Sequence, residues 1–94
     1  MRINVLYLGL IRHTMGKKKE EVEIKDNSTL SDLLNTLRET YSNLKGIFKL
    51  EKESRVDPTF IVTVNGTLVD PLKGKEVKLK DKDTVALMTL IGGG

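Results

Sequence analysis

The chain has 94 residues, no cysteine and a formal net charge of +3, with both signs of charge well represented. This length predicts one domain with one core, spanning residues 1–94. The lack of cysteine excludes disulfides, thiolate metal sites and a cysteine nucleophile. No signal peptide is recognisable and no apolar run approaches the ~20 residues of a membrane span, so we expect a cytoplasmic protein without a membrane partner.

Two extended segments are predicted at the start of the chain. Residues 3–11 carry apolar side chains on both faces of an extended backbone, which favours a well-buried strand. Val22 and Ile24 alternate with charged residues, as in a half-exposed strand. His13 and Gly16 fall in a short loop between the two segments. We therefore expect an N-terminal hairpin.

Lys17, Lys18 and Lys19 form the densest run of positive charge, and Glu20 and Glu21 follow at once. One interpretation of this run is a nucleic-acid patch. The other is a charged hairpin tip that keeps the protein soluble. We favour the second, because the aromatic platforms of a single-strand binder are missing. No nucleic-acid partner is expected.

A helix is predicted over residues 29–41. Its apolar positions 30, 33, 34, 37 and 41 fall on one face of a 3.6-residue period. Thr29, followed three residues later by Asp32, fits a variant of the capping box that begins a helix. The apolar stripe could serve a partner helix, but a single helix in a small domain is expected to spend it on its own core.

The middle of the chain is the least regular part. Gly46 ends or follows the helical region, and residues 47–50 can bury a short segment. The charged stretch 51–57 is ambiguous, and Pro58 disfavours helix at Asp57. Residues 45–58 as a whole carry no clear element.

The second half predicts a hairpin and a final strand. Residues 60–64 are strongly β-type, and Asn65 and Gly66 tolerate the positive φ of a tight turn into a short strand at 67–69. A turn is expected through Asp70 and Pro71, and a short extended piece at 77–79. Residues 81–83 form a polar turn before a last strand over 84–91. That strand leads directly into three glycines.

The pattern alone indicates an α+β fold with one amphipathic helix. Four stretches then resemble the MoaD/ThiS family of ubiquitin-like sulfur carriers, over nearly the whole chain and least between 45 and 58. They are VLYLGLIRHTMGKKKEEVEI, TLSDLLNTLRETY, VTVNGTLV and, above all, DTVALMTLIGGG at residues 83–94. The resemblance implies a β-grasp fold, with a mixed sheet packed on the main helix and the last strand beside the first. MoaD is the more similar branch, whereas a tail of three glycines is familiar from ThiS, so the pathway stays open.

The resemblance also implies a chemistry for the glycines. A MoeB/ThiF-like adenylating enzyme would consume ATP to activate the carboxylate of Gly94, and a sulfur donor would convert it to a thiocarboxylate; no cofactor would be bound by the chain. Gly93 would keep the tail slender, since glycine lacks a Cβ, and Gly92 would join it to the domain. Leu90 and Ile91 would anchor the tail in the partner, or they simply close the last strand. A MoaD-type carrier would also insert its tail into a MoaE-like large subunit of molybdopterin synthase.

An enzyme is disfavoured by the remaining residues. His13 has no cysteine to activate, and Asp81 and Asp83 have the spacing of turn formers instead of a catalytic pair. No phosphate-binding glycine loop and no metal-ligand pattern is present. The alternatives that stay open are sulfur delivery to thiazole or tRNA, a ubiquitin-like modifier that uses the same tail, and a β-grasp module that binds its partners through its surface.

Overall fold

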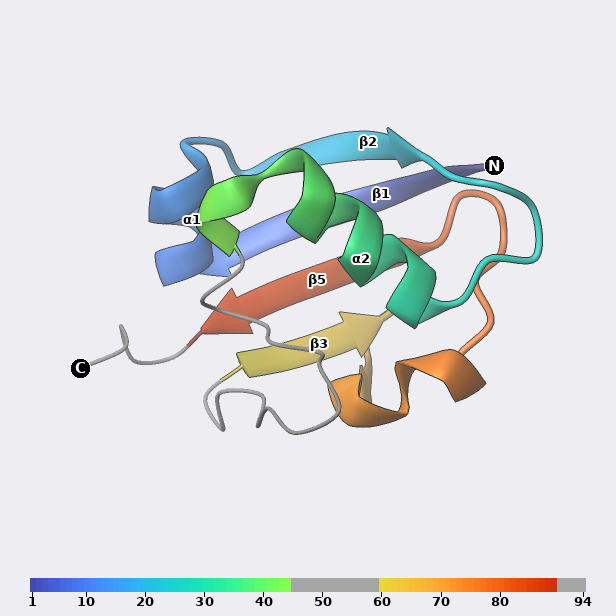
Figure 1. Cartoon of the computed structure of the whole chain (residues 1–94). Helices are drawn as coiled ribbons and strands as arrows, with labels where there is room; N and C mark the ends of the chain where they lie inside the picture. The colour runs from blue at the N-terminus through green and yellow to red at the C-terminus, as the bar shows by residue number, and fades with distance from the viewer. Residues whose placement is uncertain (45–59, 90–94) are drawn as a thin grey trace.

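The computed structural model describes residues 1–44 and 60–89, and the interpretations of residues 45–58 lie outside these ranges. Figure 1 shows the elements in chain order. The strands are β1 (Arg2–Gly9), β2 (Lys19–Glu23), β3 (Phe60–Val64), β4 (Thr67–Val69) and β5 (Thr84–Thr89). The α-helices are α1 (Leu10–Met15) and α2 (Leu30–Thr40), and two 3-10 helices are η1 (Ser42–Leu44) and η2 (Pro71–Glu76).

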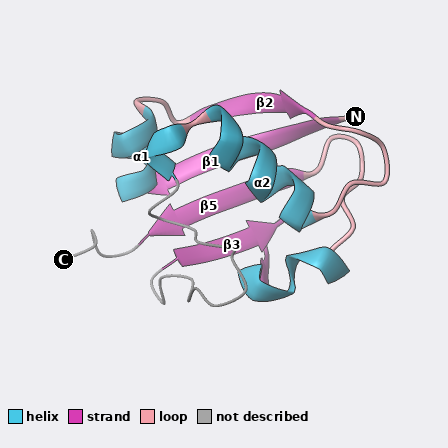
Figure 2. Ribbon diagram, in the orientation of Figure 1, coloured by secondary structure: helices cyan, strands magenta, loops and turns pink. Residues whose placement is uncertain are grey.

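The described strands form one mixed sheet in the order β2-β1-β5-β3-β4. The strands β1 and β5 lie side by side and run parallel, although they come from opposite ends of the chain. Every other pairing is antiparallel. The helix α2 crosses one face of this sheet (Figure 2). The fold is therefore the predicted ubiquitin-like β-grasp.

The core lies between α2 and the sheet face that it covers. Strand residues of one parity and the apolar stripe of α2 meet there with almost no exposed surface. The residues that are completely buried, by element, are Ile3, Val5 and Tyr7 of β1, Ile11 of α1, Leu30, Leu33 and Leu34 of α2, Leu44 of η1, Val62 of β3, and Val85 and Leu87 of β5. The prediction that the stripe of α2 serves its own core is confirmed.

The local signals for helix start and hairpin turn are also confirmed. The Thr29 hydroxyl accepts from the Asp32 amide while the Asp32 carboxylate accepts from the Thr29 amide, which is the predicted capping box. Asn65 and Gly66 both have positive φ, 51° and 83°, between β3 and β4. Asn65 also binds the start of β5, because its side-chain carbonyl accepts from the amide of Thr84 at 2.9 Å.

The predicted strand over residues 3–11 is wrong at its C-terminal end. β1 stops at Gly9, and residues 10–15 form α1 instead of extended chain and loop. The reversal occurs at Gly9, whose φ of +62° is outside the β region. The turn lets Ile11 enter the core beside α2. His13 consequently lies on a helix and not in the predicted loop.

The segment after β4 needs one further correction. The expected turn through Asp70 and Pro71 extends into the 3-10 helix η2, which Asp70 begins by accepting from the Leu72 amide at 2.9 Å. The short extended piece at 77–79 is confirmed, and it pairs with Thr29 through an isolated antiparallel bridge at Lys78. The polar turn at 81–83 is confirmed, because Asp81 accepts from the Arg2 amide and Asp83 from the Lys80 amide, each at 2.8 Å.

Candidate functional site at the end of strand β5

The candidate site begins where β5 ends. Thr89 is the last described residue, so the predicted site residues Leu90, Ile91, Gly92, Gly93 and Gly94 lie outside the described ranges. The structure does describe the end of β5 at Thr89, the residue that precedes them and that we call the base of the tail. β5 is flanked by β1 and β3, and hydrogen bonds on both sides fix the position of its last residue.

Gly9 is the neighbour of Thr89 across the sheet. A Cβ built on Gly9 would overlap the backbone carbonyl oxygen of Thr89, and the φ of Gly9 is positive. Only glycine fits both conditions without displacing the end of β5. Gly9 was not singled out from the sequence, although a glycine within an apolar run was a usable signal.

The sheet face opposite α2 carries an apolar stripe at the same end. The side chains that define it are Leu6, Leu8, Ile61, Leu68, Ala86 and Met88. Met88 lies between Leu8 and Ile61 in the register of the sheet. Leu8 and Leu68 are exposed by 38% and 70%, and α2 covers the other face of the sheet (Figure 2). An exposed apolar stripe on a sheet is typical of a protein contact surface.

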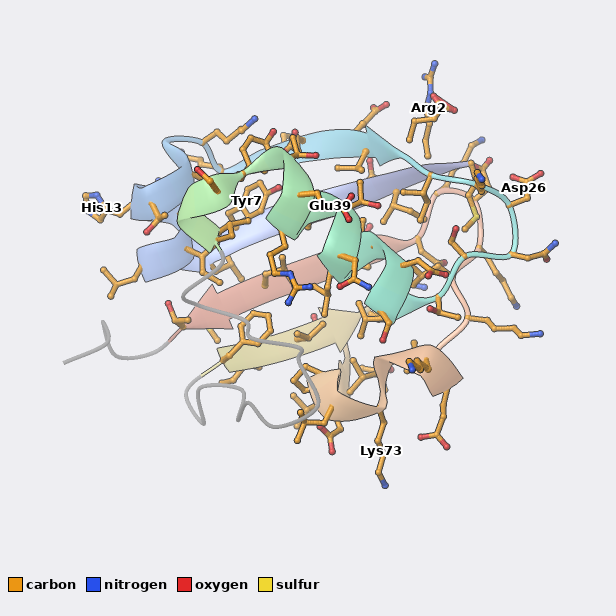
Figure 3. The ribbon with its side chains drawn as sticks, viewed as in Figure 1. Arg2, Tyr7, His13, Asp26, Glu39 and Lys73 are labelled. Atoms are coloured by element: carbon orange, nitrogen blue, oxygen red, sulfur yellow. The ribbon has the colours of Figure 1, made fainter. Side chains whose placement is uncertain are left out.

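A polar network holds the loop before β2 against the covered side of the sheet. Glu20 accepts hydrogen bonds from the hydroxyls of Tyr7 and Tyr41, and from the Lys17 ammonium at 3.3 Å. The Lys17 ammonium also donates to the Tyr41 hydroxyl at 2.9 Å. The network thus joins β1, β2 and the end of α2; Figure 3 shows Tyr7 behind α2.

The network shifts the pKa of three of its side chains, Glu20, Tyr7 and Lys17. Burial alone would raise the pKa of Glu20, but the hydrogen bonds from Tyr7, Tyr41 and Lys17 outweigh burial and hold its pKa below the usual range. Burial and the bond to Glu20 raise the pKa of Tyr7. The bond to Tyr41 raises the pKa of Lys17 against a smaller effect of burial. All three groups therefore keep their ordinary charges at neutral pH.

The other residues considered from the sequence do not assemble a catalytic centre. His13 is exposed on α1, and Asp81 and Asp83 are occupied by backbone amides. Within residues 1–44 and 60–89, no three His, Asp or Glu side chains are grouped to hold a metal ion. No helix in these ranges has the length and apolarity needed to cross a bilayer.

Known proteins share this architecture along the full chain. Small archaeal modifier protein 3 of Haloferax volcanii is 29% identical over 94 residues, which are 100% of both chains. The solution structure of a Haloferax volcanii protein matches with a TM-score of 0.80 at 29% identity, covering 100% of this chain and 87% of that one. In the complex of subunits 1 and 2 of molybdopterin-converting factor from Helicobacter pylori, the matched chain has a TM-score of 0.64 at 22% identity, with 100% of both chains covered.

A β-grasp sheet whose central strand leads into a glycine tail defines a small ubiquitin-like carrier or modifier protein. The chain belongs to the ThiS family, whose model matches residues 5–94. Its relatives are carriers and modifiers instead of catalysts, so the prediction that the chain is not an enzyme is confirmed.

Proposed function

We propose that the chain is a sulfur carrier whose reacting group is the carboxylate of Gly94. A carboxylate oxygen attacks the α-phosphate of ATP in a partner enzyme, pyrophosphate leaves, and an acyl adenylate forms. A hydrosulfide-level sulfur nucleophile then attacks the acyl carbon, and the C–O bond to AMP breaks. The product is a thiocarboxylate, whose sulfur is passed to an acceptor, and the chain supplies a substrate end instead of a catalytic group.

The position of Thr89 is the observation that carries this proposal. The chain is held to the middle of the sheet as far as Thr89, and five residues follow, three of them glycine. Five extended residues span at most roughly 17 Å. A rigid base with a slender end of that reach suits insertion into a narrow active-site channel, with Gly92 as the joint and Gly93 leaving room beside the reacting carboxylate.

The adenylating partner is proposed to dock on the apolar stripe defined above. This stripe contains Met88, next to the last described residue, and continues across β1 and β3. A ubiquitin-activating-type enzyme that accepts the tail must therefore also meet this face. Leu90 and Ile91 extend the apolar contact toward the partner.

Molybdopterin synthesis is the pathway that we propose first. The Helicobacter pylori neighbour is one subunit of a two-subunit molybdopterin-converting factor. In this assignment a MoaE-like large subunit receives the tail of the present chain and uses its sulfur. Sulfur delivery to thiazole or tRNA would use the same tail with another acceptor.

Modification of proteins is the second candidate, because the full-length relative from Haloferax volcanii is a modifier protein. In that reaction a lysine amine attacks the acyl adenylate and AMP leaves, which forms an isopeptide bond. The sequence offers a direct test, since no Lys or Arg follows Lys82. Trypsin would leave residues 83–94 attached to the modified lysine, and mass spectrometry of a host digest would detect that remnant.

Intact mass spectrometry tests the sulfur carrier itself. The protein is purified from its native host, or incubated with the host adenylating enzyme, ATP and sulfide. Replacement of one carboxyl oxygen by sulfur should add about 16 Da, a change confined to the C-terminal residue. An unchanged mass, under conditions that convert a known carrier, would contradict the assignment.

Deletion of Gly93 and Gly94 should abolish adenylation, measured as ATP-dependent pyrophosphate release, by at least about a hundredfold, because the carboxylate no longer reaches ATP. The melting temperature should stay unchanged, since both residues follow the end of β5. Complementation by the truncated chain separates the carrier from a surface-binding module. If the truncated chain restores function in the host, the tail is not the site.

A further inference from the structure

The end of the molecule from which the tail extends also carries a basic recess. Its volume is about 530 Å³ and its lining residues are Gly9, Arg12, His13, Gly16, Lys17 and Lys18. Gly9 is at once part of this recess and the partner of Thr89 in the sheet. The recess and the base of the tail are therefore adjacent.

Most of the positive charge of this recess is unpaired within the described residues. Lys17 is bound to Glu20 and Tyr41. In contrast, no described carboxylate lies within ion-pair distance of Arg12 or Lys18, and both side chains are exposed. Their charges thus face outward.

Acidic side chains gather in another region. A groove of about 890 Å³ between the end of β2 and α2 is lined by Glu23, Asp26, Asp32 and Glu39, among others. Figure 3 shows Asp26 and His13 at opposite ends of the molecule. The acidic groove therefore does not neutralise the recess, whose lining holds the basic side chains Arg12, Lys17 and Lys18 and no carboxylate from the part of the chain that the structure describes.

We infer that this basic recess, lined by Arg12, His13 and Lys18 around Gly9, contacts an acidic surface at the channel mouth of the enzyme that activates the tail. The inference rests on the proposed function. Five residues keep the reacting carboxylate within roughly 17 Å of Thr89, which lies beside Gly9 of the recess, so a partner that holds the carboxylate also approaches the recess. Exposed cations steer and orient such an approach.

Two other occupants fit the recess less well. Single-stranded nucleic acid usually stacks on aromatic rings, and no aromatic residue is part of the lining. A small anion such as phosphate is captured by buried donors in fixed positions, whereas Arg12, His13 and Lys18 are exposed. An extended acidic protein surface matches both the exposure and the spread of these charges.

The test compares two charge reversals with equal net charge. The double variant Arg12→Glu with Lys18→Glu removes the basic recess. The control, Lys73→Glu with Lys75→Glu, makes the same change on exposed residues of η2, which follows the edge strand β4. Adenylation of each full-length chain by the host adenylating enzyme is measured as pyrophosphate release, at low salt and near 1 M salt.

We expect the recess variant to raise KM by about tenfold at low salt with kcat little changed, since charges of this kind act on encounter. The control should stay within about twofold of the wild type. The difference in KM between the two variants should nearly vanish near 1 M salt, because exposed charges more than about 3 Å apart are then largely screened from one another. Equal effects of both variants, or no effect of either, would overturn the inference.

The remaining outcomes are also decisive. If the wild-type chain is not adenylated at all, the proposed function fails and this inference fails with it. If the wild type is adenylated and the recess variant has the same KM as the wild type, the inference fails and the proposed function stands. Host tRNA, added in a fluorescence binding assay, gives a further control. If the wild type binds tRNA and the recess variant does not, while the KM of adenylation is the same for both, the recess is assigned to nucleic acid instead.

Discussion

Gly9 is the residue on which the geometry of the tail base depends. We expect Gly9→Ala to lower the free energy of unfolding by about 2 to 4 kcal/mol, because the new Cβ combines a positive φ with overlap of the Thr89 carbonyl oxygen. Gly16→Ala is the matched control. Gly16 also has positive φ, 70°, but nothing lies within 4 Å of its added Cβ. Urea denaturation of both variants measures how much more stability Gly9→Ala loses than Gly16→Ala, which is the cost of the contact with the Thr89 carbonyl oxygen. Equal losses of unfolding free energy would show that the backbone shifts to relieve this overlap.

The same residue explains why the first strand was predicted too long. Residues 3–11 are apolar almost throughout, and such a run does not reveal by its period where a strand ends and a helix begins. The end depends on a contact between Gly9 and Thr89, which are 80 positions apart in the sequence. A contact at that separation is invisible to local pattern.

Glu20 joins three elements, and its replacement by Gln should be costly at neutral pH. The amide cannot accept every hydrogen bond that the carboxylate receives from Tyr7, Tyr41 and Lys17, so we expect a loss of about 1 to 3 kcal/mol. Glu21→Gln is the control, because Glu21 is exposed and its ion pair with an exposed Arg2 nitrogen, at 3.7 Å, is weak. Its replacement should cost at most about 0.5 kcal/mol.

The sign of the pH dependence follows from the lowered pKa of Glu20. A carboxylate whose pKa is lower in the folded state stabilises that state above its unfolded pKa, about 4.3, and stops doing so as the pH falls through the folded value. The stability difference between wild type and Glu20→Gln should therefore be largest near pH 7 and shrink below pH of about 4.3. A constant difference from pH 7 to pH 3, by urea denaturation, would contradict the role of the charge.

Elements with local signals were predictable, and those built by distant contacts were not. The capping box of α2 needs only residues 29 and 32, and the turn between β3 and β4 needs only Asn65 and Gly66. The Glu20 network brings together residues 13 and 21 positions apart, so no single window contains it. The helix α1 likewise depends on burial of Ile11 against other elements.

At the scale of the whole molecule, the parallel pairing of β1 with β5 creates the proposed docking face. Alternation along each strand predicts two faces, but only the sheet order brings Leu8, Ile61 and Met88 together from three separate segments. The predicted tail residues 90–94 lie outside the described ranges, so their roles stay predictions. What the fold adds to the tail is the surface around its base.

This surface should matter for affinity and not for the chemistry of the tail. Leu8→Asn places a polar side chain in the apolar stripe beside Met88 without changing the net charge. Loss of one buried leucine contact, about 1.5 to 3 kcal/mol, predicts a KM for adenylation that is raised about 10- to 100-fold, with kcat preserved at saturating partner. Leu72→Asn is the matched control, since Leu72 is 66% exposed on η2, outside the stripe. Equal kinetics of the two variants, with both melting temperatures close to that of the wild type, would remove the stripe from the interface with the adenylating partner.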